Sequence, residues 1–232
     1  MRMARAPRFA AVDTAVRVTP EQAGALYKSG YRTVFRYVDR VLSDPDEDTR
    51  WPINLTRPEL EDLLGAGLCV GLVQYFSTRY ESTANGAKFS VSYGERMGEA
   101  AALNARRLGI PDGVTIFNDL EACEYASADM VRDYCDGWSH KLTLLGYAAG
   151  LYVGSGIGGS VAGYTSGSTL YGMPRYRAYW RAASIVPQIP NRGWTVIQGC
   201  EISIHGLACD QDIIALDHRS RSSRDRFMVV SP

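Results

Sequence analysis

Short runs of β-branched and aromatic residues alternate with helical patterns along the first two thirds of the chain, and this alternation limits the possible fold most. Strand-like runs are expected at Phe9–Asp13, Thr33–Val38, Cys69–Phe76, Val114–Glu121 and Ala148–Val153. Helical patterns follow the first four runs, with Thr19, Thr56 and Ser127 as expected N-caps, and a glycine-rich segment with at most a short helix follows the fifth. Five β-then-α units in a row predict parallel strands joined by right-handed crossovers.

The pattern changes in the last third of the chain. Candidate strands at Tyr176–Ala183, Trp194–Gln198 and Asp210–Leu216 are separated by only about ten residues each. A parallel crossover needs a dozen or more residues, so hairpin-like turns are expected between these three strands. The sequence therefore predicts an α/β fold, a TIM-like barrel of the (β/α)5β3 kind over residues 9–217, followed by a basic C-terminal tail at 218–232. A doubly wound open sheet is the alternative.

Carboxylates mark the expected ends of three strands. Asp13 ends the first strand, and Asp119 and Glu121 end the fourth, two residues apart and thus on one face. An antiparallel last strand would begin at the same mouth with Asp210 and Asp212. Reactive groups of α/β barrels lie at the C-terminal strand ends, so these acids are expected to converge there. Crowded carboxylates raise the pKa of at least one member, as glycosidases require.

A simpler interpretation is that these acids are ordinary strand-end residues paired with arginine. Arg36 on the second strand is the candidate to neutralise one of them. Polar and aromatic side chains near the expected mouth suit a sugar ring, which presents apolar C–H patches and a hydroxyl rim. These candidate substrate-binding residues are Arg36, Tyr37, Tyr75, Tyr152, Trp180, Gln198 and Asp212. Core packing is the alternative for each aromatic residue.

Composition excludes several classes of protein. Lys plus Arg and Asp plus Glu number 25 each, so net charge does not indicate a nucleic-acid or membrane-surface partner. The sequence contains no apolar run long enough to span a bilayer and no secretory signal pattern. No metal-ligand spacing is found, and no cofactor is expected. Cys200 and Cys209 flank the last turn and could form a disulfide, although reduced thiols are the preferred interpretation.

Several short motifs resemble one family. They are Ala11–Thr14, Phe35–Tyr37, Asn118–Glu121, Leu151–Val153, Tyr179–Ala182, Ile197–Gln198, Cys209–Asp212 and the helical stretch Gly98–Pro111. In order and spacing this series resembles the glycoside-hydrolase-like domain family of actinobacteria and their phages, which is itself similar to the family 25 muramidases. The resemblance extends over about residues 9–217.

The resemblance implies hydrolysis of the β-1,4 bond between N-acetylmuramic acid and N-acetylglucosamine in peptidoglycan. Carried over by position, Glu121 is the general acid, and Asp119 orients the substrate's acetamido group or stabilises positive charge. Asp13 and Asp210 fill the remaining acidic positions of the mouth. The alternatives are a non-catalytic glycan-binding module on the same barrel and a glycosidase for another envelope glycan.

The expected working form is a monomer without cofactor or nucleic-acid partner. We expect it to be made in the cytoplasm and to reach the cell wall after phage-type lysis, as an endolysin does, or by a non-classical export route.

Overall fold

The structure of the chain is a computed structural model. It describes residues 1–5, 7, 10–40, 53–77, 89–121, 127–153, 175–182, 195–214 and 227–232. The side chains of Phe76, Ser77, Glu121, Ala128 and Val153 lie outside this description.

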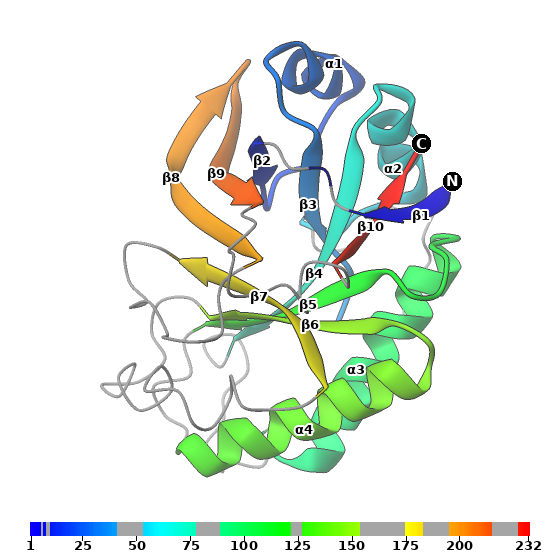
Figure 1. Ribbon diagram of the computed structural model, residues 1–232, viewed down its shortest axis with the longest axis vertical. Helices are drawn as coiled ribbons and strands as arrows, with labels where there is room; N and C mark the ends of the chain where they lie inside the picture. Colours follow the sequence, from blue (N-terminus) through cyan, green and yellow to red (C-terminus); the bar gives the residue numbers. More distant parts are fainter. Residues whose placement is uncertain are drawn as a thin grey trace.

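Eight strands close into a barrel (Figure 1). They are β2 (Ala10–Asp13), β3 (Thr33–Tyr37), β4 (Cys69–Ser77), β5 (Thr115–Glu121), β6 (Ala148–Val153), β7 (Tyr176–Ala182), β8 (Val196–Ile204) and β9 (Leu207–Ile214). Neighbours from β2 to β8 pair in parallel. The last strand, β9, is antiparallel to β8 on one side and to β2 on the other, and the β2–β9 pairing closes the ring. The predicted TIM-like α/β barrel is therefore confirmed.

The arrangement of the last strands corrects the (β/α)5β3 prediction. Within the described ranges, helices follow β2, β3, β4 and β5, and β7 pairs in parallel with both β6 and β8. The residues that join β6 to β7 and β7 to β8 lie outside the described ranges. The predicted turn between the last two strands is correct, but the hairpin is longer than expected, because β8 continues to Ile204 and β9 begins at Leu207. His205 and Gly206 form its turn, both with positive φ.

Each described helix begins at a hydroxyl side chain that caps a free backbone N–H. Thr19 precedes α1 (Pro20–Lys28) and forms a capping box with Gln22. Thr56 precedes α2 (Arg57–Gly65), Ser90 precedes α3 (Val91–Arg107) and Ser127 precedes α4 (Ala128–Leu144). The capping oxygen accepts a hydrogen bond from the third helical residue in every case, which satisfies one of the unpaired donors of the first turn. The caps predicted at Thr19, Thr56 and Ser127 are confirmed.

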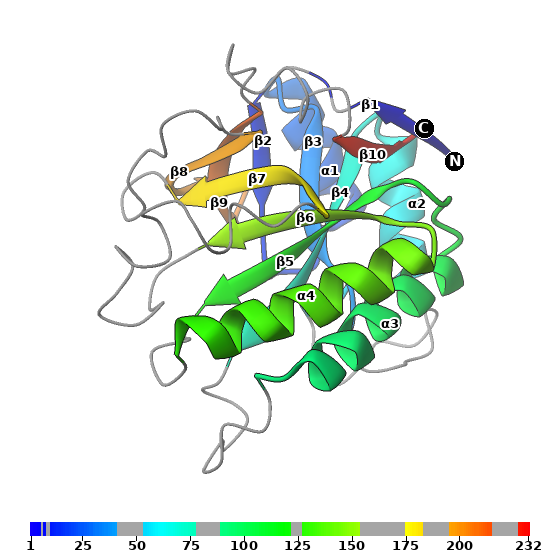
Figure 2. The same ribbon diagram turned by 60° about the horizontal axis from the view of Figure 1, so that its bottom comes forward.

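Helices α3 and α4 lie side by side outside the barrel (Figure 2). Glycine allows this close approach: a Cβ at Gly98 would collide with the carbonyl oxygen of Trp138, and one at Gly94 with that of Tyr134. The Trp138 indole donates to Gln74 Oε1 on β4 at 2.7 Å, which attaches α4 to the strands.

Aromatic rings fill the interior of the barrel. Phe35, Phe117, Trp180 and Phe227 contact one another with ring centroids 4.4–6.0 Å apart. Glycines on neighbouring strands leave room for them, since Gly71 pairs with Phe35 and Gly150 pairs with Phe117. The expected inward orientation of Phe117 is confirmed.

The two ends of the chain add strands outside the barrel. β1 (Arg2–Arg5) pairs with β10 (Met228–Ser231), and β10 pairs with β4. The N–H of Met228 donates to Thr115 Oγ1 at 3.2 Å. Residues 218–226 of the predicted basic tail lie outside the described ranges, whereas Met228–Ser231 form strand β10 of the sheet.

Candidate active site

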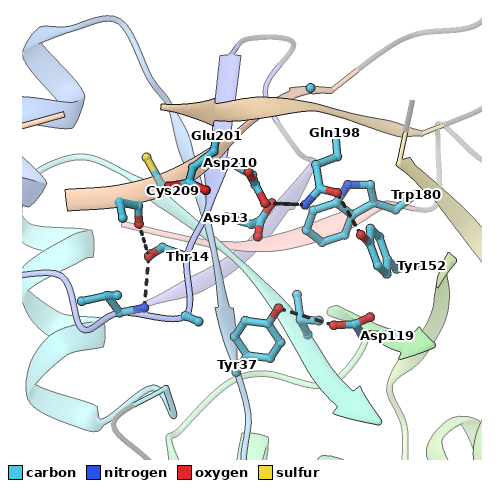
Figure 3. Close-up of a pocket in the computed structure, with 15 residues that line it drawn as sticks. Asp13, Thr14, Tyr37, Asp119, Tyr152, Trp180, Gln198, Glu201, Cys209 and Asp210 are labelled. Atoms are coloured by element: carbon cyan, nitrogen blue, oxygen red, sulfur yellow. Dashed lines mark hydrogen bonds between the residues drawn. The ribbon is translucent and has the colours of Figure 1, made fainter. Parts of the chain in front are cut away.

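A pocket of about 510 Å³ opens where the parallel strands end (Figure 3). It is lined by Asp13, Thr14, Ala15, Val16, Tyr37, Val73, Asp119, Tyr152, Trp180, Gln198, Gly199, Glu201, Ala208, Cys209 and Asp210. The predicted site residues among these are Asp13, Tyr37, Asp119, Tyr152, Trp180, Gln198 and Asp210. They come from seven different strands, and barrel closure brings them to one opening, as predicted from the strand ends.

Three acidic residues form a row along one wall of the pocket. Asp13 on β2 is the register partner of Asp210 on β9, and Asp210 is the partner of Glu201 on β8. Adjacent strands are about 4.8 Å apart, so neighbouring members of this row experience each other's charge. Burial, and next the charge of Glu201, raise the pKa of the Asp210 carboxyl.

Glu201 was missed by the sequence analysis, because the expected seventh strand ended at Gln198. The register of β8 shifts between Gln198 and Glu201, and this irregularity turns Glu201 toward the row of acids. The alternation of Ile202 and Ile204 with polar neighbours is typical of a strand and could have extended the prediction.

Gln198 connects two acids of the row. Its Nε2 donates to Asp13 Oδ2 at 2.8 Å and to Asp210 Oδ2 at 3.2 Å. The hydroxyl of Tyr152 donates to Gln198 Oε1 at 2.8 Å, which fixes the orientation of the amide. One amide nitrogen therefore donates to both carboxyl groups, which offsets part of the repulsion between the two acids. Its polar atoms face these protein groups, so Gln198 holds the acids in place instead of presenting a free amide to a ligand.

Asp212 does not line the pocket, contrary to its predicted role in substrate binding. It is fully buried, and its Oδ1 accepts a hydrogen bond from Trp180 Nε1 at 3.1 Å. The Trp180 ring packs edge-on against Tyr152 with centroids 5.1 Å apart, so Asp212 supports an aromatic wall of the pocket. Asp212 is too deep to contact a substrate.

Asp119 faces the pocket from β5, on a different wall from the row of acids (Figure 3). It is nearly buried, and the hydroxyl of Tyr37 donates to its Oδ2 at 3.4 Å. Tyr75 packs edge-on against Tyr37 at 6.4 Å and is not among the residues that line this pocket. Tyr75 therefore contacts the pocket residue Tyr37 and does not itself line this pocket.

Glu121 is the last residue of β5 and is the register partner of Ser77 on β4. Its side chain lies outside the described part of the structure.

Arg36 has a different partner from the one predicted. Its guanidinium forms a buried ion pair with Glu59 on α2, with Nε 2.7 Å from Oε1 and Nη2 3.2 Å from Oε2. Arg36 Nη1 also donates to the carbonyl oxygen of Thr14, and Glu59 Oε1 accepts from the N–H of Val18. Arg36 therefore neither neutralises an acid of the mouth nor contacts a ligand there. The pair holds the segment that follows Asp13.

The pocket has a strongly acidic lining. Its described lining residues include four carboxylates and no lysine or arginine. Burial, together with the nearby carboxylates, also raises the pKa of the Cys209 thiol to about 11. Cys200 and Cys209 are both free. Among the residues that the structure describes, no group of three or more His, Cys, Asp or Glu side chains is arranged to hold a metal ion.

Within the described ranges, no helix combines the length and the apolar character needed to cross a lipid bilayer.

Solved structures that share this fold include the following two. An uncharacterized protein from B. stearothermophilus superimposes with a TM-score of 0.65 and 21% identity, over 94% of this chain and 99% of that one. The modular autolysin LytC from Streptococcus pneumoniae, solved in complex with a synthetic peptidoglycan ligand, has a TM-score of 0.55 and 11% identity. That match covers 88% of this chain and 46% of LytC. At these identities the likeness is one of fold.

A curated relative is similar in sequence over a shorter stretch. The uncharacterized protein YbfG of Bacillus subtilis (strain 168) is 37% identical over 126 residues, which is 53% of this chain. The matched segment is 16% of YbfG, which is therefore far longer than the region it shares with this chain.

The barrel and its acidic, aromatic-walled pocket define a TIM-like α/β domain of the glycoside-hydrolase-like class. The family model described as Rv2525c-like, glycoside hydrolase-like domain matches residues 24–218. The chain belongs to this family, as its motifs indicated.

Proposed function

We propose that this barrel is a peptidoglycan hydrolase that cleaves the β-1,4 bond between N-acetylmuramic acid and N-acetylglucosamine. The observation that carries the proposal is the convergence of Asp13, Asp119 and Asp210 on one pocket whose walls include Tyr37 and Trp180. Glycosidases use such carboxyls to protonate a leaving oxygen and to stabilise an oxocarbenium-like transition state. Aromatic faces suit sugar rings. Family membership supports glycoside chemistry, and the fold shared with LytC, which was solved with a peptidoglycan ligand, supports the substrate class.

Glu121 is the proposed general acid. It ends β5 two residues after Asp119, so strand alternation leads us to expect its side chain on the same side as Asp119. Asp119, held by the Tyr37 hydroxyl, would orient the acetamido group of the substrate or stabilise positive charge at the reacting carbon. The nearly complete burial of Asp119 strengthens either electrostatic role, because little water screens its charge.

Asp13 and Asp210 would supply fixed negative charge from another wall of the pocket. Gln198 donates to both, which holds their carboxyl groups in place while the sugar ring gains positive charge. In this arrangement the proposed general acid Glu121 and Asp119 come from β5, and the two further charges come from β2 and β9.

Hydrolysis of purified cell walls tests the proposal. Wild-type protein is expected to reduce wall turbidity and release reducing ends, and Glu121→Gln is expected to lower the rate about 10²–10⁴-fold, the usual contribution of a general acid. Glu61→Gln, an exposed position on α2, is the matched control and should keep the wild-type rate. Mass spectrometry of the products identifies the reducing-end sugar, which is N-acetylmuramic acid for a muramidase.

Other outcomes assign other functions. Wild type and Glu121→Gln that bind walls equally, with no reducing ends released by either, would indicate a glycan-binding module. Reducing ends of N-acetylglucosamine would indicate a glucosaminidase. Because peptidoglycan lies outside the cell membrane, the proposal places the working protein at the cell wall.

A further inference from the structure

A fully buried carboxyl lies one layer deeper in the barrel than the row of acids. Asp212 is two residues from Asp210 on β9, so both side chains are on the inner face of the strand. Its register partners are Ala11 on β2 and Gln198 on β8. The Trp180 indole on β7 donates to Asp212 Oδ1.

The other carboxyl oxygen of Asp212, Oδ2, is buried and has no hydrogen-bond partner among the described residues. Asp13, the register partner of Asp210, lies diagonally across from Asp212 on the paired strands β2 and β9, and such diagonal neighbours are close enough for their side chains to interact. Two ionised carboxylates cannot hydrogen-bond to each other, because both are acceptors only, whereas a proton on one makes it a donor.

The surroundings determine which acid carries that proton. The ionisable groups that face Asp212 are Asp13 from β2, together with Asp210 and Cys209 from its own strand. Strand β8, which pairs with β9, contributes Gln198, and β7 contributes Trp180; neither side chain titrates. Asp13 accepts from Gln198 and lines the pocket, whereas Asp212 is fully buried. An ionised Asp212 would be a buried charge beside two other acids, so the proton belongs on Asp212.

We propose that Asp212 is a positioning residue that keeps its proton at neutral pH and donates it to the carboxylate of Asp13. Asp13 then receives hydrogen bonds from two neutral donors, Asp212 and Gln198. Both interactions stabilise its ionised form. Burial, and next the charge of Asp13, raise the pKa of Asp212 well above its ordinary value, in agreement with this assignment.

The consequence for catalysis rests on the proposed function. In that reaction Asp13 is a fixed negative charge and not the proton donor. The proton for the leaving oxygen must come from another wall of the pocket, where Asp119 and the end of β5 lie. Asp212 itself does not contact the substrate.

Infrared spectroscopy of the protein in heavy water at neutral pH tests the assignment directly. A protonated carboxyl has a C=O stretch distinct from that of a carboxylate. We expect this band in wild type, and we expect Asp212→Asn to remove the component of the band that belongs to Asp212. The asparagine amide still accepts from Trp180 and donates to Asp13, so the variant is expected to fold. Asp129→Asn, at an exposed position on α4, is the control and should leave the band unchanged.

A second variant tests the coupling to Asp13. In Asp13→Asn the neighbouring negative charge is gone, so the Asp212 band should disappear at a lower pH than in wild type. The proposal is overturned if wild type lacks the band at neutral pH, if the band is unchanged in Asp212→Asn, if Asp212→Asn does not fold, or if Asp13→Asn leaves the titration unchanged. None of these measurements involves a glycan, so failure of the proposed function is seen separately, in the cell-wall assay.

Discussion

Asp13 and Asp210 are direct register partners on the antiparallel strands β2 and β9, although they lie near opposite ends of the chain. Like charges directly opposite each other destabilise a pair of strands. The structure offsets this repulsion with one amide, because Gln198 Nε2 donates to both carboxylates. The repulsion between these two acids therefore lowers the stability of the fold, and the Gln198 amide on β8 reduces that loss.

Removal of the Gln198 amide should leave the repulsion between Asp13 and Asp210 uncompensated. Gln198→Ala is expected to lower the free energy of unfolding at pH 7 by about 1–3 kcal/mol, since the buried acceptor Asp13 and the partly buried acceptor Asp210 lose a donor. Urea denaturation measures the change. Gln211→Ala, which removes an amide with a weak contact to the Tyr31 hydroxyl at 3.4 Å, is the matched control with a smaller expected loss. The loss in Gln198→Ala should shrink at acidic pH, where the aspartates are protonated, and an equal loss at both pH values would contradict this account.

The ion pair between Arg36 and Glu59 should be sensitive to removal of one partner. Both side chains are fully buried, so Glu59→Leu leaves an unpaired buried guanidinium, and the expected loss of stability is about 3–5 kcal/mol. The double variant Arg36→Met, Glu59→Leu should be more stable than Glu59→Leu alone, because no buried charge remains. Thermal and urea unfolding measure both.

An exposed ion pair provides the comparison for this prediction. Arg132 lies 3.3 Å from Asp129 on the surface of α4, and Arg132→Ala should change stability by less than about 1 kcal/mol. A double variant at Arg36 and Glu59 that is as unstable as Glu59→Leu would show that the charge imbalance is not the cause.

The contact between α3 and α4 depends on the absence of side chains at two glycines of α3. Gly98→Ala places a Cβ against the Trp138 carbonyl oxygen, and the expected loss of stability is about 1–3 kcal/mol from overpacking. Gly24→Ala in α1 meets no atom within 4 Å and should instead stabilise the protein by about 0.5–1 kcal/mol through helix propensity. Opposite signs in the two denaturation curves are the expected result, and equal signs would contradict the packing argument.

Stability should depend on pH through Asp212. Burial raises its pKa in the folded state above the unfolded value of about 3.9, so its contribution is complete below that pH. It is lost as the pH rises through the folded-state value, because the unfolded chain releases this proton first. Wild type should therefore lose stability relative to Asp212→Asn above about pH 4, by up to about 1.4 kcal/mol per pH unit. Urea unfolding across this range measures the difference, and parallel pH profiles would contradict it.

Much of the candidate site follows from the period-two pattern of strands. Asp119 and Phe117 alternate with outward-facing neighbours, and the prediction that both face the barrel interior or its mouth is confirmed. The same rule could have corrected the role given to Arg36. Tyr37 is its neighbour on β3 and lines the pocket, so Arg36 must face the helices, where Glu59 lies.

By itself the sequence determined the helix caps, the strand-and-helix order that makes a barrel, and the acids at the strand ends. These features depend on residues only a few positions apart, whose hydrogen bonds and side-chain directions follow from local geometry. The tertiary structure alone decided that β7 pairs in parallel with β8, that Glu201 joins the row of acids and that Asp212 lies beneath Asp13. Each of these depends on the register between strands distant in the chain, which is set when the barrel closes and its interior packs.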